Sequence, residues 1–398
     1  MTDFESIKLV CEITRKVSAS VIDEFLINYA AQRNNLEYRM NQAFALYKHV
    51  NRKFPKELVN RLKSQYLAHN IFREGGLLKS YMKHPALLSL ETDKRSYLEL
   101  QAEHPWTFSF STIKSNPADS FYIMNDVFSD HEYLLHSPGM KDTLKEREVA
   151  LWFNLISFNG ECWQSYGPIG AFSSFESDDI FFFATELNLA IDSYEELLAN
   201  LEQNPVPYMM LLSGADSPFI LSKGERLVNC VAEYDLESPD TSELSHSFKE
   251  EYNREVYRLA LKDWSGPPHF AETYFDENKK IILLSAMTES GFRALVLELN
   301  KYGYEFSVDP FLRVNFSMYV IANDILKRKT SLNEYEGFFS KELSKAEQGN
   351  YDKLNLLLKL LTPYINEGRA PDIEELAEKA DVDVETARDL IKQIMKKF

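Results

Sequence analysis

The spacing of apolar residues changes near Trp106, and this change constrains the fold more than any other feature of the sequence. Residues 1–100 repeat apolar side chains at helical spacing. From Trp106 onward, Trp106, Phe108 and Phe110 alternate with small polar residues, which predicts a half-buried β-strand. Later strands and helices follow without a β-α-β rhythm. The sequence therefore predicts an α+β fold with a mostly antiparallel sheet.

Two hairpins are predicted in the body of the chain. Asn159-Gly160 stands between aromatic runs, and this dipeptide is typical of a tight hairpin turn. The segments 274–275 and 281–284 flank a polar turn and predict a second hairpin. Further strands are expected at 180–183, 208–212 and 227–234, and helices at 193–201, 250–262 and 290–302.

The length of 398 residues is too great for one domain, and composition suggests three parts. We expect a helical domain at 1–100, an acidic α+β body at 101–330 and a helical tail at 331–398. The body is either one domain or two subdomains, 101–204 and 205–330.

Charge is unevenly distributed over a chain whose net charge is −17. Residues 1–100 carry 16 Lys and Arg against 11 Asp and Glu, whereas residues 101–330 carry 18 against 36. An acidic body is a poor surface for nucleic acid. It favours solubility, or contact with the basic head of the same or another copy.

Cysteine usage and hydropathy predict a cytoplasmic protein. Cys11, Cys162 and Cys230 are far apart and odd in number, so we expect no disulfide framework and a reducing compartment. Charged residues interrupt the N-terminal segment, so we expect no signal peptide. No apolar run reaches the roughly 18 residues that a membrane span needs.

The last fifty residues have the spacing of three short amphipathic helices. Leu354, Leu357, Leu358 and Leu361 mark one face of a first helix near 353–366. Asp372 is placed to cap a second helix that buries Ile373, Leu376, Ala377 and Ala380. After a turn at 381–382, Asp383 is placed to cap a third helix, whose predicted inward residues are Val384, Ala387, Ile391, Ile394 and Met395.

The pattern Ile-x-x-Leu-Ala-x-x-Ala-x-Val-Asp-x-x-Thr-Ala-x-x-Leu-Ile within 371–398 resembles the helix-turn-helix modules of bacterial regulators. The resemblance implies a recognition surface on the third helix, formed by Thr386, Arg388, Lys392, Gln393 and Lys396. Asp381 replaces the usual turn glycine. Glu385 and Asp389 on the same helix would repel phosphate. We therefore favour a protein partner over DNA for this tail.

Motifs that specify chemistry are absent. The sequence holds no phosphate-binding loop, no dinucleotide fingerprint, no His-Glu-x-x-His, no Gly-x-Ser-x-Gly and no Cys-x-x-Cys. We assign no catalytic residue and expect no cofactor. The remaining candidates for metal ligands are Asp130, His131, Glu132 and His136. Because adjacent strand residues point to opposite faces, only Asp130 and Glu132 could converge, and a polar loop is the simpler interpretation.

Three other clusters each allow two interpretations. Glu176, Asp178 and Asp179 could perform acid–base chemistry if burial separated their pKa values, or could be a solvated strand entry. His269 and Glu272 suggest a loop hydrogen bond rather than catalysis. Between residues 33 and 73, Lys and Arg are interleaved with aromatics. That mixture suits single-stranded nucleic acid, or a helical head whose aromatics form the core.

These observations favour a non-enzymatic binding or regulatory protein that acts through protein–protein contacts or self-association. One alternative is a DNA-binding transcriptional regulator that uses the tail. Another is an enzyme that uses carboxylates and histidines of the body. No membrane partner is expected.

Overall fold

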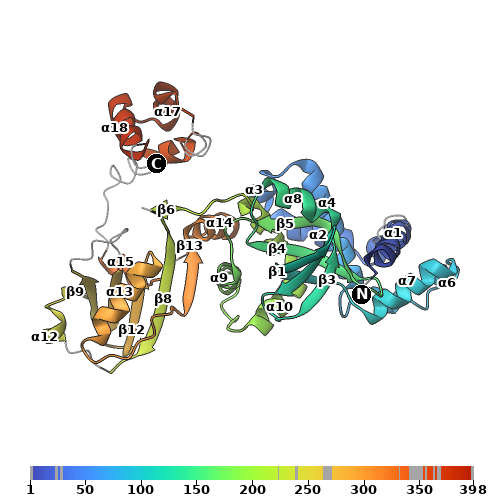
Figure 1. The fold of residues 1–398 in the computed structure, drawn as a ribbon, viewed down its shortest axis with the longest axis horizontal. Helices are drawn as coiled ribbons and strands as arrows, with labels where there is room; N and C mark the ends of the chain where they lie inside the picture. The colour runs from blue at the N-terminus through green and yellow to red at the C-terminus, as the bar shows by residue number, and fades with distance from the viewer. Residues whose placement is uncertain are drawn as a thin grey trace.

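The computed structural model describes residues 3–22, 26, 30–222, 224–237, 241–262, 271–330, 332–339, 353–354, 356–361, 364 and 369–395. Helices form both ends of the chain and sheets dominate the middle, as Figure 1 shows, so the α+β prediction is confirmed. In the described ranges, no helix is both long and apolar enough to cross a lipid bilayer.

Helices form the N-terminal head, and the helical apolar spacing over 36–54 is divided between two helices. Tyr47 leaves helical geometry, with φ −106° and ψ 26°, and so separates α2 from α3. Pro55 precedes α4, where a missing N–H costs little. The helices are α1 (Phe4–Val21), α2 (Leu36–Leu46), α3 (Lys48–Asn51), α4 (Lys56–Phe72), α5 (Leu78–Tyr81), α6 (Pro85–Leu88) and α7 (Thr92–Glu103).

Five strands close into a small barrel in the order β1-β2-β3-β5-β4. They are β1 (Thr107–Ala118), β2 (Phe121–Asp126), β3 (Glu132–His136), β4 (Leu151–Phe158) and β5 (Trp163–Phe172). Neighbouring strands are antiparallel except β3 and β5, which run parallel with Leu135 opposite Trp163. Helix α8 (Pro138–Glu146) connects β3 to β4.

Residues 108–111 of β1 are buried on both faces, which corrects the expectation of a half-buried strand there. Phe108 and Phe110 stack on Phe153 of β4 with ring centroids 5.1 and 4.4 Å apart. On the other face, the Tyr133 hydroxyl of β3 donates to Ser109 Oγ at 3.0 Å. Strands β1 and β3 are not neighbours, so this bond crosses the barrel interior. Closure of the barrel buries the face that an open sheet would leave in water.

The hairpin predicted at Asn159-Gly160 is confirmed as β4–β5, but its loop is longer than a two-residue turn. Residues 159–162 form the loop, and Gly160 takes a φ of +98° that favours glycine. Asn159 Oδ1 accepts hydrogen bonds from the backbone N–H groups of Glu161 and Cys162 at 2.9 and 2.8 Å. These bonds fix the loop.

Two predicted strands are helical. Residues 180–183 lie in α9 (Ser177–Leu187), because Glu176 and Asp179 form a capping box that starts a helix before the phenylalanine run. Residues 208–212 fall in α11 (Pro205–Met210) and the following 3-10 turn η2 (Leu211–Gly214), where Pro205 occupies the first helical turn. The helix expected near 193–201 is α10 (Tyr194–Gln203).

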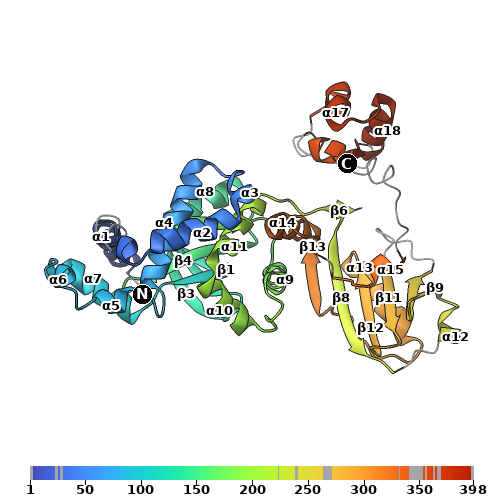
Figure 2. The same cartoon turned by 180° about the vertical axis from the view of Figure 1, so that it is seen from behind.

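A second, antiparallel sheet has six strands in the order β13-β8-β12-β11-β10-β9 (Figure 2). They are β8 (Val228–Asp235), β9 (Phe248–Asn253), β10 (Val256–Leu261), β11 (Ala271–Asp276), β12 (Ile281–Ala286) and β13 (Leu312–Asn315). The hairpin predicted at 274–284 is confirmed as β11–β12. The helix expected at 250–262 is wrong: Arg254 and Glu255 take positive φ values of 53° and 60° and turn the chain into the β9–β10 hairpin.

Two longer helices belong to the second half of the fold, and each packs in a different core. Helix α13 (Glu289–Asn300) packs on one sheet face, whereas α14 (Phe316–Leu326) follows β13 and places Met318 and Ala322 in the core that surrounds the barrel. The short elements are β6 (Leu221–Ser222), β7 (Glu225–Arg226), α12 (Thr241–Leu244) and α15 (Glu336–Phe339).

The tail has a hydrophobic cluster whose described members all belong to the tail. Helices α17 (Ile373–Ala380) and α18 (Val384–Met395) are joined through Asp381, which takes the left-handed φ of 53°. Asp372 caps α17 by accepting the N–H of Glu375 at 3.1 Å. Val384 was expected inside but is 37% exposed, and the side chains of Ile394 and Met395 lie outside the described residues. The buried cluster comprises Leu357, Leu361, Leu376, Ala377, Ala380, Ala387 and Ile391.

Replacing Leu376 by Ala tests whether the tail core is independent. Leu376 is 2% exposed, so its truncation should cost the tail about 2–5 kcal/mol. Hydrogen exchange should accelerate over 373–395 and stay unchanged over the barrel strands. Leu356→Ala is the matched control, because Leu356 is 43% exposed. Equal acceleration in both variants, or acceleration in the barrel, would contradict a separate tail core.

Candidate functional site

The metal-ligand candidates do not gather. Asp130 and Glu132 are exposed at the β2–β3 turn, where Asp130 accepts a hydrogen bond from Asn125 and Glu132 pairs with Lys114. His131 is exposed beside them. His136 is buried at the opposite end of β3. Within the described ranges, no group of three or more His, Cys, Asp and Glu side chains is arranged to hold a metal ion.

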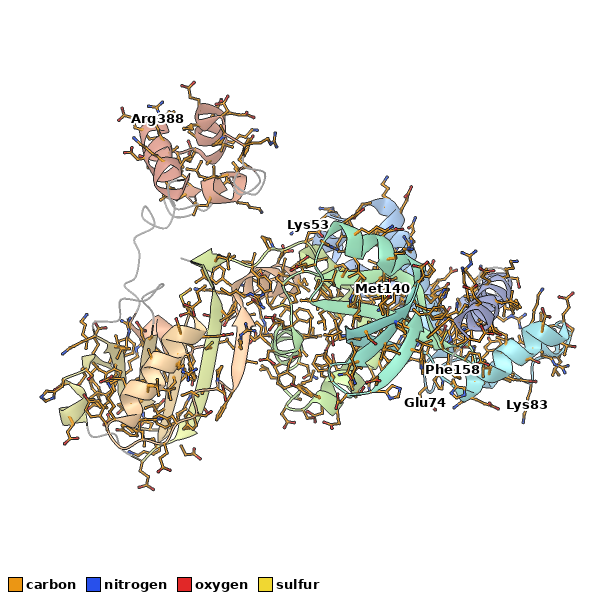
Figure 3. All side chains as sticks on the ribbon, in the orientation of Figure 1. Lys53, Glu74, Lys83, Met140, Phe158 and Arg388 are labelled. Atoms are coloured by element: carbon orange, nitrogen blue, oxygen red, sulfur yellow. The ribbon has the colours of Figure 1, made fainter. Side chains whose placement is uncertain are left out.

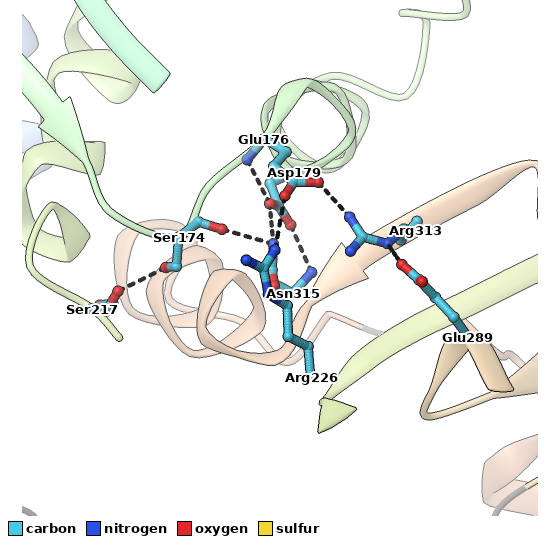
Figure 4. Close-up of polar contacts among 8 residues, drawn as sticks. All are labelled: Ser174, Glu176, Asp179, Ser217, Arg226, Glu289, Arg313 and Asn315. Atoms are coloured by element: carbon cyan, nitrogen blue, oxygen red, sulfur yellow. Dashed lines mark hydrogen bonds and ion pairs between the residues drawn. The ribbon is translucent and has the colours of Figure 1, made fainter. Parts of the chain in front are cut away.

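The acidic trio is located at the start of α9, where it joins the barrel region to the second sheet. Figure 4 shows two of its members, Glu176 and Asp179. Asp179 is fully buried and accepts three hydrogen bonds. They come from the backbone N–H of Asn315 at 2.6 Å, the Asn315 side chain at 2.5 Å and the N–H of Glu176 at 2.8 Å. Asn315 ends β13, so these bonds tie α9 to the sheet.

Ion pairs surround this buried carboxyl. Glu176 pairs with Arg226 at 3.2 Å and with Arg313 of β13, and Arg313 also pairs with Glu289 at the start of α13 (Figure 4). Burial raises the pKa of Asp179 to about 7 and also raises that of Asp178. Every polar atom of the Asp179 carboxyl is occupied by protein donors. The trio is therefore neither a solvated strand entry nor a free acid–base pair, but a structural junction.

Glu272 is also held by protein partners. It is 9% exposed on β11, where Arg258 forms two bonds to it and the Tyr274 hydroxyl donates to its Oε2 at 2.5 Å. It lines a cavity of about 360 Å³ between the sheet and α14. His269, its suggested partner, lies outside the described residues.

A groove of about 570 Å³ crosses the head between α2, α3 and α4. Four cationic side chains line it: Lys48 and Arg52 from the α3 region, and Lys56 and Lys63 from α4. No Asp or Glu is among its lining residues. The remaining lining residues are Asn41, Phe44, Ala45, Asn51, Phe54, Val59 and Asn60. The groove therefore offers positive charge together with amide donors.

Most of the groove's charge is uncompensated. Lys48, Arg52 and Lys56 are exposed, and none has an ion-pair partner among the described residues. Lys63 donates to Asn41 Oδ1 at 3.1 Å, which leaves its charge in the groove. By contrast, Lys53 (labelled in Figure 3) lies outside the groove and pairs with Asp324 at 2.7 Å.

Most aromatic residues of the head pack into or against its core, although Tyr38 on α2 is 65% exposed. Phe44 is 3% exposed and lies edge-to-face with Tyr66, with ring centroids 6.1 Å apart. Phe54 is half-buried against the same core. Between the two interpretations of the head sequence, this arrangement agrees with basic solvated faces over an aromatic interior. The two rings that line the groove are buried Phe44 and half-buried Phe54, so the groove offers little of the open aromatic surface on which single-stranded bases stack.

The predicted recognition surface on α18 is mixed in charge. Thr386, Arg388 and Lys392 are exposed, and Figure 3 shows Arg388 on the outside of the tail. Glu385 and Asp389 are exposed on the same helix. The Thr386 hydroxyl donates a hydrogen bond to the carboxylate of Asp383, the capping residue of α18, at 3.2 Å. The Gln393 side chain and Lys396 lie outside the described residues, and the resemblance to a helix-turn-helix module stays a prediction.

No protein-family model, no curated protein and no solved structure matches this chain. Its function must therefore be argued from its own surfaces. The cation-rich segment that forms the groove was visible in the sequence, but the absence of carboxylates from the groove walls was not. The sequence also gave no sign that Cys11 and Cys162 are in contact.

Replacing Asp179 by Ala tests the junction. The substitution leaves the N–H groups of Asn315 and Glu176 buried without an acceptor, which should cost about 3 kcal/mol or more. Urea unfolding measures the loss. Asp178→Ala is the matched control, because that neighbouring carboxyl is only partly buried. An equal effect of the two substitutions would contradict the role given to Asp179.

The stability contributed by Asp179 depends on pH in a defined direction. An unfolded aspartate has a pKa near 3.8 and folded Asp179 about 7, so the folded state keeps a proton that the unfolded state releases. The contribution is complete below about pH 4 and is lost as the pH rises through about 7. Unfolding at about pH 4.5 should therefore show a larger difference between wild type and D179A than unfolding at about pH 8. The reverse order would contradict this assignment.

Proposed function

We propose that this chain is a binding or regulatory protein whose head holds an acidic segment of a protein partner in the cation-lined groove. The observation that carries the proposal is the set of exposed cations, Lys48, Arg52 and Lys56, that face a groove without carboxylates. Uncompensated charge of one sign in a concave surface attracts the opposite charge and accelerates association. No catalytic step enters the proposal.

An acidic protein suits the groove better than nucleic acid does. Phe44 is buried and gives no surface for base stacking. The net charge of −17 and the 36 acidic residues of 101–330 would repel an extended polyanion that reaches beyond the groove. A short acidic segment requires only the local field. The acidic body of a second copy has the same chemistry, so self-association is one form of this function.

The tail supplies a second contact surface in this proposal. The described members of its hydrophobic cluster all lie within the tail, where α17 and α18 bury their apolar faces against each other and against Leu357 and Leu361. Exposed Leu356 and Val384 leave apolar area on its outside beside charges of both signs. Such a mixed surface suits protein contact more than a uniformly anionic backbone.

Reversing the groove charges tests the proposal. The triple variant Lys48→Glu, Arg52→Glu and Lys56→Glu should weaken binding of a fluorescent polyglutamate peptide at least about tenfold, as judged by anisotropy. Binding to the wild type should weaken with added salt, because exposed charges are screened. Glu at position 56 stands in the first turn of α4, where negative charge is favourable, so the variant should stay folded.

The matched control changes three exposed cations of the head that do not line the groove, as Arg39→Glu, Lys83→Glu and Arg95→Glu. This control has the same net charge as the groove variant, but it should bind the polyglutamate peptide as tightly as the wild type does. Sedimentation velocity at low salt would reveal self-association that depends on the groove. Equal loss in both triple variants, tighter binding of a single-stranded oligonucleotide through the groove, or no binding and no self-association would each overturn the proposal.

A further inference from the structure

Two cysteines that are 151 residues apart in sequence meet where α1 packs on the barrel. Cys11 lies on α1 and Cys162 ends the loop of the β4–β5 hairpin. Their Sγ atoms are 3.5 Å apart, and each side chain is 1% exposed. Both are thiols in this structure. A disulfide requires an S–S distance near 2.05 Å, so the two sulfur atoms need to approach by only about 1.5 Å.

Hydrogen bonds hold this pair in position. Asn159 Nδ2 lies 3.3 Å from Cys11 Sγ and 3.6 Å from Cys162 Sγ, while its Oδ1 is fixed by the loop N–H groups. From the other side, Gln164 Nε2 donates to the carbonyl oxygen of Cys11 at 3.1 Å. Helix and hairpin are thus aligned on either side of the sulfur atoms. Because the two cysteines are already held close together, formation of a disulfide between them would cost less conformational entropy.

The surroundings favour the reactive form of one thiol. The hydrogen bond from Cys162 lowers the pKa of Cys11, and His136 lowers it further, whereas the same contact raises the pKa of Cys162. His136 is 8% exposed, packs on Phe121 and has a buried Nδ1 without a hydrogen-bond partner. A thiolate beside a thiol is the arrangement needed for an attacking and a resolving cysteine.

Access to the pair is governed by the attachment of α1. The first turns of α1 are held by a small cluster, formed by Phe4, Ile7 and Cys11 with Ala118, Phe121, Leu134 and Cys162. Leu9 and Ile13 on the same helix are 59% and 54% exposed. Small clusters open locally at lower cost than a domain core does. Opening would bring Cys11 to solvent, and closure would return it to Cys162.

We propose that Cys11 and Cys162 form a reversible disulfide that fastens α1 to the barrel when a hydroperoxide is present. The Cys11 thiolate attacks the peroxide, so that an S–O bond forms, the O–O bond breaks and hydroxide leaves as water after taking up a proton. Cys162 sulfur then attacks Cys11 sulfur, and the sulfenic oxygen leaves with the Cys162 proton as a second water. Two thiols are oxidised and one hydrogen peroxide is reduced to two waters. A dithiol reductant reverses the bond by exchange.

Cys230 provides an internal comparison. It is fully buried in the second sheet, and burial raises its pKa to about 12. It has neither the neighbouring thiol nor the neighbouring His136 of the barrel pair. Under the same oxidant it should stay reduced, because reactivity follows thiolate character and access.

The test uses the full-length protein and stoichiometric hydrogen peroxide. Cleavage after Glu gives separate peptides for the three cysteines, 6–12, 162–176 and 226–233. Mass spectrometry should find 6–12 joined to 162–176, with Cys230 still open to alkylation after unfolding. Amide exchange in α1 should slow at least about tenfold on oxidation and recover with dithiothreitol.

Matched serine variants complete the test. Cys11→Ser and Cys162→Ser should abolish both the cross-link and the slowed exchange, whereas Cys230→Ser should retain them. Equal oxidation of Cys230, disulfide-linked dimers, conversion of Cys11 to sulfinic acid while Cys162 stays reduced, or a cross-link without slowed exchange in α1 would each overturn the proposal. The wild-type cross-link is read directly, so a misfolded variant would not obscure the outcome.

Discussion

Closure of the five-stranded barrel is the constraint on which the other parts of this structure depend. It places Phe108 and Phe110 outward, where they stack on Phe153 and meet the surrounding helices, and it turns Ser109 inward to Tyr133. Buried hydroxyls need partners, and the barrel interior provides them across strands that are not neighbours. The aromatic outer face then orders the helices of the head, because large rings contribute most of the buried apolar area.

The acidic side chains of this chain serve different purposes in different places. Glu176 and Asp179 form the ion pairs and hydrogen bonds of the junction with β13, whereas Glu272 is bound by Arg258 and Tyr274. A carboxyl whose oxygens already accept protein N–H or O–H groups has little capacity left for a ligand. The groove cations Lys48, Arg52 and Lys56 differ, because no acid of the part of the chain that the structure describes forms an ion pair with them. We propose that this positive surface, on a protein of strong net negative charge, is the point of attraction for an acidic partner.

Periodicity predicted the class of this fold but not every element. The hairpins at 159–160 and 274–284 could be predicted because their turn residues report local conformation. The strand predicted at 180–183 was wrong, because apolar residues without alternation fit a strand or a buried helix equally well. The capping box that decides for a helix lies just before these residues. At 250–262, Tyr252, Val256 and Leu259 match helical spacing by coincidence, whereas two residues at positive φ make a hairpin. Local patterns also cannot show that acids are missing from the walls of a groove, because its lining comes from three helices.

The contact between Cys11 and Cys162 marks a sharper limit of sequence inference. Isolated, odd-numbered cysteines predict no disulfide framework, and the thiols of this structure are compatible with that prediction. Yet the packing of α1 on the β4–β5 loop brings the sulfur atoms of Cys11 and Cys162 within 3.5 Å of each other. The spacing of cysteines in the sequence could not predict this contact. A switchable disulfide differs from a structural one in its reduction potential, which is higher when the reduced form is stabilised or the disulfide is strained. Here Asn159 and Gln164 keep the reduced pair aligned, so the proposed fastening of α1 needs a change of redox state and a local opening of α1, but no change of topology.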